Sequence, residues 1–297
     1  MSAPIGGRSS RRSLPYADNS DMTESWQWDE TLYAGSAAHY VRGRLPYPDD
    51  LGKQIATAAG LGKRARALDV GCGPGSLTLL LAGSVDHVVG IDADPAMIAQ
   101  ASLAARRAGL ENILWRRMRA EELPVDLGCF DLVTFAQSLH WMDRQQVLTI
   151  VREMLRPGGR CVHVHATTHR GDSTVDPLPR PRPPYDEIDA LVSSYLGLTR
   201  PAGRSSGDED SVYRQSGFDR ATYFKIEGGE VVERTVEEIV AATFSLSSST
   251  PYLLGPRQAD FEADLKALLE ATSQDGLFCE RVPELAFDVW RSTADPR

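Results

Sequence analysis

Two hydrophobic patterns alternate along residues 65–166. Nearly continuous apolar runs, of which 129–136 is the longest, are typical of strands buried on both faces of a parallel sheet. Five such segments are predicted as strands: 65–70, 87–91, 112–116, 129–136 and 160–166. Helical segments are predicted between them, at 77–81, 95–108 and 144–155. The alternation of strand and helix predicts βαβ units and an α/β fold.

Residues outside this region follow other patterns. The N-terminus is rich in Ser, Arg, Gly and Pro, so we expect a disordered tail over 1–25 and one folded domain over 26–297. Residues 26–60 are interpreted as an N-terminal lid. Residues 167–215 contain a proline-rich stretch, a helix and a polar loop, and we expect this insertion to cover the strand ends as a second lid.

The C-terminal part, residues 216–297, is expected to complete the sheet. It contains a predicted strand at 218–226 and amphipathic helices at 236–244 and 259–271. A last strand at 285–290 is predicted to be antiparallel.

Composition narrows the class of protein. The chain has 297 residues, 42% of them hydrophobic and 25% charged, which is typical of a soluble globular protein. A net charge of −9 argues against a nucleic-acid partner, and no apolar run has the length of a membrane span. The N-terminus lacks the apolar segment of a secretory signal, and the four cysteines have neither pairing nor zinc spacing. We therefore expect reduced thiols and a cytoplasmic location.

A glycine-rich turn follows the first predicted strand. Gly71, Gly73 and Gly75 alternate with other residues, and Ser76 can cap the helix that follows. Glycines are needed in such a turn when a ligand must lie against bare backbone. The segment therefore predicts a nucleotide-like ligand at this end of the strand.

Two acidic residues decide between the possible ligands. A dinucleotide site has the spacing G-x-G-x-x-G and places a pyrophosphate on the helix N-terminus. Here the spacing is G-x-G-x-G, and Asp69, two residues before the first glycine, would repel a diphosphate. Asp92 ends the second strand at the distance where a carboxylate accepts hydrogen bonds from ribose hydroxyls. An adenosine with a cationic tail fits both acids, and S-adenosylmethionine (SAM) is such a molecule.

These motifs carry a family resemblance. Leu-Asp-Val-Gly-Cys-Gly-Pro-Gly at 68–75 and Val-Gly-Ile-Asp-Ala-Asp-Pro-Ala-Met at 89–97 resemble motif I and its partner in class I SAM-dependent methyltransferases. The resemblance implies a Rossmann-like, seven-stranded, mostly parallel sheet with helices on both faces and an α-helical insertion or lid. It also implies a SAM-binding core over 64–166, with S-adenosylhomocysteine as the product.

The resemblance extends to the cofactor residues. The segment 33–48 is similar to the lead-in of many small-molecule methyltransferases, although Leu45 stands where proline is usual. This similarity implies that Arg44 meets the methionine carboxylate of SAM, whereas Tyr40 either reaches the same end or packs the lid. The implied cofactor-binding residues are Tyr40, Arg44, Asp69, Gly71, Cys72, Gly73, Gly75, Asp92, Ala93, Met97, Ala120, Glu121 and Gln137.

The adenine contact departs from the family pattern. Residues 118–124 resemble the loop in which an aspartate accepts from the adenine amino group, but Arg119 holds that position and has no acceptor. Glu121, the Ala120 backbone or water must replace it. Met97 either lies against the adenine ring or belongs to the core.

The segment that follows the fourth predicted strand contains residues predicted to contact the methyl acceptor. Gln137-x-x-His-Trp-x-Asp143 resembles the site loop of the trans-aconitate methyltransferase subgroup. The resemblance implies that His140 acts as a base or binds a carboxylate and that Trp141 forms a pocket wall. The alternative is a histidine buried against the neighbouring strand.

Further histidines lie on the fifth strand. His163 and His165 share one strand face, and with His169 they form H-x-H-x-x-x-H. Because no carboxylate or thiolate is near them in the sequence, we expect no metal and interpret His165 as part of a polar substrate-binding wall.

The sequence thus predicts a SAM-dependent methyltransferase that acts on a small molecule, on the oxygen of a carboxylate or hydroxyl group. N- or C-methylation of a metabolite and a non-catalytic SAM-binding scaffold or regulator are the alternatives. We expect no nucleic-acid or membrane partner, and either a monomer or a homodimer.

Overall fold

The computed structural model describes residues 29–173, 176–197 and 208–294. The predicted disordered tail, 1–25, lies outside these residues. Within them, no helix combines the length and apolar character needed to cross a membrane.

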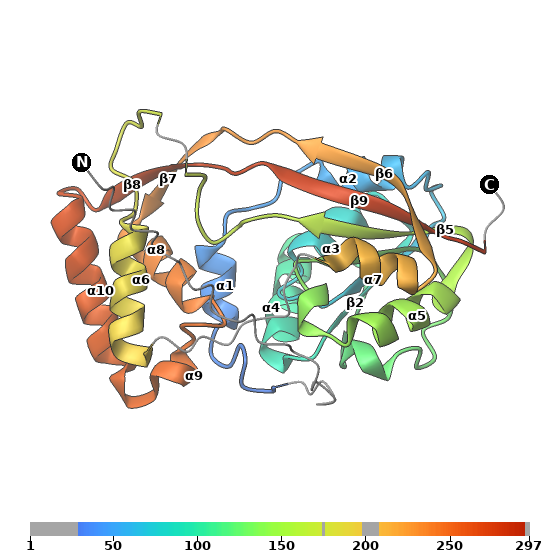
Figure 1. Cartoon of the computed structure of the whole chain (residues 1–297), viewed down its shortest axis with the longest axis horizontal. Helices are drawn as coiled ribbons and strands as arrows, with labels where there is room; N and C mark the ends of the chain where they lie inside the picture. The colour runs from blue at the N-terminus through green and yellow to red at the C-terminus, as the bar shows by residue number, and fades with distance from the viewer. Residues whose placement is uncertain (1–28, 174–175, 198–207, 295–297) are drawn as a thin grey trace, which may run out of the picture.

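A seven-stranded sheet organises the molecule (Figure 1). Its strands lie in the order β3-β2-β1-β4-β5-β9-β6. Neighbouring strands from β3 to β5 pair in parallel, and β9 is antiparallel to both β5 and β6. The strands are β1 Arg66–Val70, β2 His87–Asp92, β3 Ile113–Arg117, β4 Phe130–Ala136, β5 Leu155–His165, β6 Phe218–Ile226 and β9 Leu285–Ser292. The predicted fold class is confirmed, including the antiparallel last strand. β5 begins five residues earlier than expected because Leu155 already pairs with Phe130.

Apolar side chains alternate along the strands and build a core on each face of the sheet. On one face, Leu68 and Val70 pack with Leu148 of α5 (Arg144–Met154). On the other face, Ala67 and Val88 pack with helices α2 (Leu51–Ala58) and α3 (Ser76–Ala82). Helix α4 (Pro95–Arg107) lies against β2 and β3. Helices therefore cover both faces, as predicted.

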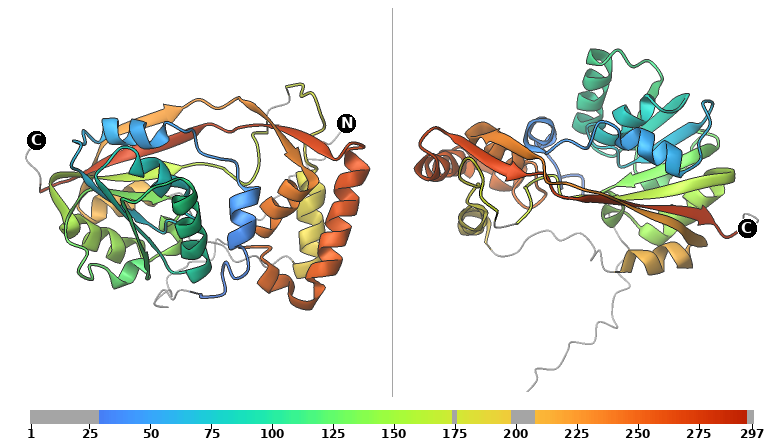
Figure 2. Two further views of the ribbon diagram at one scale, coloured as in Figure 1. Left: turned by 180° about the vertical axis from the view of Figure 1, so that it is seen from behind. Right: turned by 90° about the horizontal axis from the view of Figure 1, so that it is seen from above.

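A helical body stands beside the sheet (Figure 2). Its own core joins α6 (Tyr185–Leu196), α8 (Val236–Phe244), α9 (Pro251–Leu254) and α10 (Gln258–Thr272). A two-stranded antiparallel sheet, β7 (Val231–Thr235) with β8 (Leu277–Arg281), belongs to this body, and the sequence did not predict it. Because α8, α9 and α10 lie between the two strands in the sequence, there is no short hairpin turn from which their pairing could be predicted.

The expected insertion is divided between two places. Helix α6 joins the helical body, whereas α7 (Glu209–Gln215) packs on α5 and β6. The first helix, α1 (Ala37–Gly43), packs closely on α8: a Cβ at Gly43 would lie 2.1 Å from the backbone nitrogen of Ala242. The N-terminal segment therefore connects the helical body to the sheet.

Candidate active site

The glycine turn has the conformation that the sequence predicted. Gly71, Gly73 and Gly75 all have positive φ, at +69°, +55° and +89°, a region that favours glycine. The N–H groups of Gly71 and Cys72 both donate to the carbonyl oxygen of Ile91, at 2.9 Å. The turn is thus held against the end of β2. The predicted cap at Ser76 is wrong, because Gly75 is the N-cap of α3 and Ser76 is its first helical residue.

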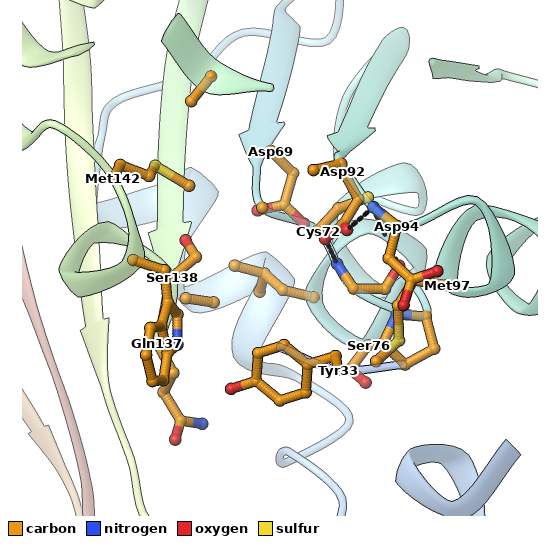
Figure 3. Close-up of a pocket in the computed structure, with 18 of the residues that line it drawn as sticks. Tyr33, Asp69, Cys72, Ser76, Asp92, Asp94, Met97, Gln137, Ser138 and Met142 are labelled. Carbon is orange, nitrogen blue, oxygen red and sulfur yellow. Dashed lines mark hydrogen bonds between the residues drawn. The ribbon is translucent and has the colours of Figure 1, made fainter. Parts of the chain in front are cut away.

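A cavity opens beside this turn, at the carboxyl ends of β1, β2 and β4 (Figure 3). Most of the predicted cofactor residues and one predicted substrate residue line it: Tyr40, Asp69, Gly71, Cys72, Gly73, Asp92, Ala93, Met97, Ala120, Glu121, Gln137 and Trp141. Four predicted site residues do not line it: Arg44, Gly75, His140 and His165.

Asp69 is held deep in the cavity wall. The residue is 1% exposed, and its two carboxylate oxygens accept hydrogen bonds from the hydroxyls of Thr78 (2.6 Å) and Thr134 (2.7 Å). Burial raises the pKa of Asp69 above its ordinary value. Two threonines on neighbouring elements therefore fix the orientation of this acid.

Asp92 lies at the end of β2 and is fixed by backbone donors. One oxygen accepts from the N–H of Gly73 at 2.8 Å and the other from the N–H of Asp94 at 2.9 Å. Burial raises the pKa of Asp92 to about 6. Among the residues that the structure describes, no Lys or Arg forms an ion pair with Asp69 or Asp92. The cavity therefore has the electrostatic character to accept a cation.

Aromatic side chains form the opposite wall. Tyr33 contacts Trp141 edge to face, with ring centroids 5.9 Å apart. The hydroxyl of Tyr47 accepts a hydrogen bond from Gln137 at 3.0 Å. Burial raises the pKa of both Tyr33 and Tyr47, so these phenols are neutral at pH 7. Electron-rich rings opposite two acids add a second feature that favours a cationic ligand.

Arg44 does not line the cavity in this arrangement, and its predicted contact with the methionine carboxylate stays a prediction. Its guanidinium donates to the hydroxyl of Ser245 (2.8 Å) and to the carbonyl of the same residue (2.9 Å), and it stacks on the Tyr40 ring. Since α8 ends at Phe244 next to these partners, Arg44 ties the N-terminal segment to the helical body. Of the pair Tyr40 and Arg44, Tyr40 lines the cavity and Arg44 does not.

The loop after β3 borders the cavity through residues 118–121. Oε1 of Glu121 accepts from the N–H of Asp143 at 2.9 Å, and the second carboxylate oxygen keeps its acceptor capacity. Arg119 donates its backbone N–H to Glu122 at 2.7 Å. The carbonyl of Ala120 likewise accepts from the N–H of Leu123 at 3.2 Å, so Glu121 and the backbone of Ala120 both stay candidates to meet adenine.

His140 lies behind the cavity wall. It sits in the short helix η2 (Leu139–Trp141), and its ring contacts that of Trp141 with centroids 4.7 Å apart. Burial, assisted by the charge of Arg144, lowers the pKa of His140 to about 4. The imidazole is therefore neutral at pH 7, and Trp141 rather than His140 forms the wall itself.

His165 faces a different set of partners. Its Nε2 lies 2.8 Å from a carboxylate oxygen of Asp288 on β9, and its ring lies against that of His163. Glu209 of α7 is close to both histidines. The expectation of no nearby carboxylate is wrong, because α7 and β9 bring acids distant in the sequence onto this face of β5.

Several residues of the cavity were not predicted as site residues. They are Tyr33, Tyr47, Pro74, Ser76, Leu77, Asp94, Met118, Arg119, Ala136, Ser138 and Met142. Most directly adjoin a motif that was recognised, so extending each motif by a few positions would have found them. Tyr33 and Tyr47 lie in the lead-in segment, whose path to the cavity depends on long-range packing.

Comparisons with known proteins agree with this geometry. A family described as "Methyltransferase domain" matches residues 67–159. The methyltransferase YcgJ of Bacillus subtilis is 33% identical over 188 residues, which cover 62% of this chain and 68% of YcgJ. The chain belongs to the methyltransferase family.

Two further relatives extend the comparison. An uncharacterised methyltransferase of Mycobacterium bovis is 38% identical over 133 residues, covering 44% of this chain. This match spans about half (51%) of that relative's length. The 27-O-demethylrifamycin SV methyltransferase of Amycolatopsis mediterranei is 28% identical over 239 residues, covering 74% of this chain and 83% of the relative.

A solved structure shows the same fold. The crystal structure of a candidate type II methyltransferase from Anaeromyxobacter dehalogenans superposes with a TM-score of 0.51 at 24% identity, covering 85% of this chain and 99% of that one. The resemblance to class I methyltransferases is thus confirmed for the family and the fold. Membership of the trans-aconitate methyltransferase subgroup stays a prediction.

Proposed function

We propose that this methyltransferase uses SAM and transfers the methyl group to a small molecule. The observation that carries the proposal is the pair of buried acids, Asp69 and Asp92, at one cavity with no cation of the described chain paired to them. A cationic ligand would relieve the cost of burying these charges. A dinucleotide, with two phosphates, would increase it.

The residues present fit SAM. Asp92 would accept from the ribose hydroxyls, and the glycine turn with Asp69 would hold the cationic methionine part. Met97 and the backbone of Ala120 would border the adenine. When bound, SAM supplies a methyl group activated by its sulfonium, so the protein's own residues orient the reactants and exclude water.

We propose oxygen as the methylated atom. The name of the Amycolatopsis relative describes transfer at an O-linked position, and its match covers 74% of this chain. Trp141 and Tyr33 would form the apolar wall against the acceptor.

His140 would position Trp141 from behind the cavity wall rather than act as a base toward the acceptor. A base with a pKa of about 4 is poorly matched to proton transfer at pH 7. Substitution His140→Ala should therefore raise KM for the acceptor more than it lowers kcat.

The test is a transfer assay with an unbiased acceptor pool. The full chain is incubated with methyl-labelled SAM and a metabolite extract, and labelled products are identified by mass spectrometry. We expect a product methylated on oxygen, made by the wild type and by Asp86→Ala, an exposed control, but greatly reduced in Asp92→Ala. Label on nitrogen or carbon would overturn the oxygen assignment. Tight SAM binding with no labelled product would favour the alternative function, a non-catalytic SAM-binding scaffold or regulator.

A further inference from the structure

A cluster of metal-ligating side chains lies outside the cavity, on the face of β5 that α7 covers. His163 and His165 project from the same face of this strand, with ring centroids 4.3 Å apart. Glu209, the first residue of α7, approaches both rings. One ligand atom from each of the three residues lies within 4.8 Å of the other two.

The distances fit a shared ion better than hydrogen bonds. Glu209 Oε2 lies 3.5 Å from Nδ1 of His163 and 3.7 Å from Nδ1 of His165. Hydrogen bonds from nitrogen to oxygen span about 2.7–3.2 Å. A tetrahedral zinc ion with ligands at about 2.0–2.1 Å has ligand-to-ligand distances of about 3.3 Å. The two distances from Glu209 are therefore close to the spacing that one such ion requires, and all three ligand atoms lie within 4.8 Å of one another.

A second carboxylate, that of Asp288, orients the imidazole of His165. Nε2 of His165 lies 2.8 Å from Oδ2 of Asp288, which leaves Nδ1 directed to the other side of the ring, where Glu209 lies. Asp288 is itself held by Nε of Arg220 at 2.9 Å. Metal-bound histidines commonly donate their second ring N–H to a carboxylate in this way.

The donor set selects the class of ion. Two imidazole nitrogens and one carboxylate oxygen suit zinc and neighbouring transition metals, whereas magnesium and calcium prefer oxygen ligands. His163 is 3% exposed and the side chain of Glu209 is 13% exposed, whereas the side chain of His165 is 38% exposed, so water reaches the site from the side of His165. Three protein ligands leave a fourth position for water.

We propose that His163, His165 and Glu209 form a site for a divalent transition-metal ion of the zinc class, with Asp288 orienting His165. The ion joins α7 to β5, two elements otherwise far apart in the sequence. This site stands whether or not the proposed function is correct.

Cobalt titration tests the site directly. The full chain is freed of metal by a chelator and titrated with Co²⁺, whose visible absorption reports tetrahedral binding, and Zn²⁺ is then added as a competitor. We expect one equivalent of Co²⁺ to bind and Zn²⁺ to displace it. Glu209→Gln and His165→Ala should weaken binding at least tenfold, and Asp288→Asn by about 10- to 100-fold.

Two variants serve as controls, and circular dichroism verifies that every variant folds. His87→Ala removes an exposed histidine and Cys129→Ser an exposed thiol, and both should bind Co²⁺ as the wild type does. The proposal is overturned if the wild type binds no Co²⁺, if Glu209→Gln and His165→Ala bind it unchanged, or if binding is lost in Cys129→Ser.

Discussion

Two parts of the molecule bury carboxylates in opposite ways. In the helical body, Glu280 on β8 receives Nη1 of Arg234 at 2.9 Å, the hydroxyl of Tyr185 at 2.6 Å and the N–H of Gly171 at 2.5 Å. At the cavity, Asp69 and Asp92 receive only hydroxyl and backbone donors. Glu280 has its cation within the chain, whereas the two aspartates face an open cavity.

This comparison distinguishes a buried carboxylate that stabilises the fold from buried carboxylates that bind a ligand. A buried charge without an opposite charge costs free energy, and the pKa of Asp69 and of Asp92 is raised accordingly. Arg234 also donates to the carbonyl of Gly43, at 2.6 Å, so the Glu280 pair links the small sheet to α1. We infer that the pair of Glu280 and Arg234 stabilises the fold. Asp69 and Asp92, in contrast, bind a ligand that supplies the positive charge.

The largest expected effect is at the structural pair. Arg234→Leu should lower the free energy of unfolding by about 3–5 kcal/mol, because Glu280 keeps a buried charge without its cation. Urea unfolding measures this loss, and calorimetry should show unchanged SAM affinity in the folded fraction. The double variant Arg234→Leu/Glu280→Leu should recover only part of the stability, because the Tyr185 hydroxyl and the N–H of Gly171 lose their acceptor. A loss below about 1 kcal/mol in the single variant would remove the distinction between the two regions.

The corresponding substitution at the cavity, Asp69→Asn, should weaken SAM binding without lowering the free energy of unfolding. In Asp69→Asn the amide can still pair with Thr78 and Thr134, since hydroxyls both donate and accept. We expect an unchanged or higher free energy of unfolding, but SAM affinity about 10- to 100-fold weaker through loss of a charged contact. Calorimetry and urea unfolding measure the two quantities.

Asp131→Asn provides the control for that experiment. Asp131 lies on β4 and contacts Arg156 and the backbone N–H of Arg66, away from the cavity. Its substitution should leave SAM affinity unchanged. If Asp69→Asn also binds SAM within twofold of the wild type, Asp69 is not one of the carboxylates that bind the ligand.

The smallest effect is a dependence of affinity on pH. The raised pKa of Asp92, about 6, means that its carboxyl is ionised above pH 6 and protonated below it. Because ribose hydroxyls donate best to the ionised form, SAM affinity should be constant above pH 7 and fall by about tenfold between pH 7 and pH 5. Asp92→Asn should bind weakly with no such fall. An equal fall in both proteins would assign the titration to another group.

The parts that the sequence predicted well are those determined locally. The strand, the glycine turn and Asp69 lie within residues 66–75, and the conformation of each glycine follows from the turn itself. Asp92 was predicted from its spacing after the glycine turn, at the end of the next parallel strand. These rules do not depend on the rest of the chain.

The parts that the sequence missed depend on distant contacts. Arg44 has the chemistry to bind a carboxylate, but Ser245, 201 positions away, holds its guanidinium. The carboxylate beside His165 comes from α7, and β7 pairs with a strand beyond three intervening helices. Side-chain chemistry was visible in the sequence in each case, whereas the partner was not.

The most direct measurement of the central claim is a calorimetric titration of the wild-type chain with SAM and, separately, with NAD. Two buried acids at a glycine turn predict that SAM binds with one equivalent per chain and that saturating NAD does not reduce its affinity. Binding of NAD in place of SAM, or of neither ligand, would contradict the account.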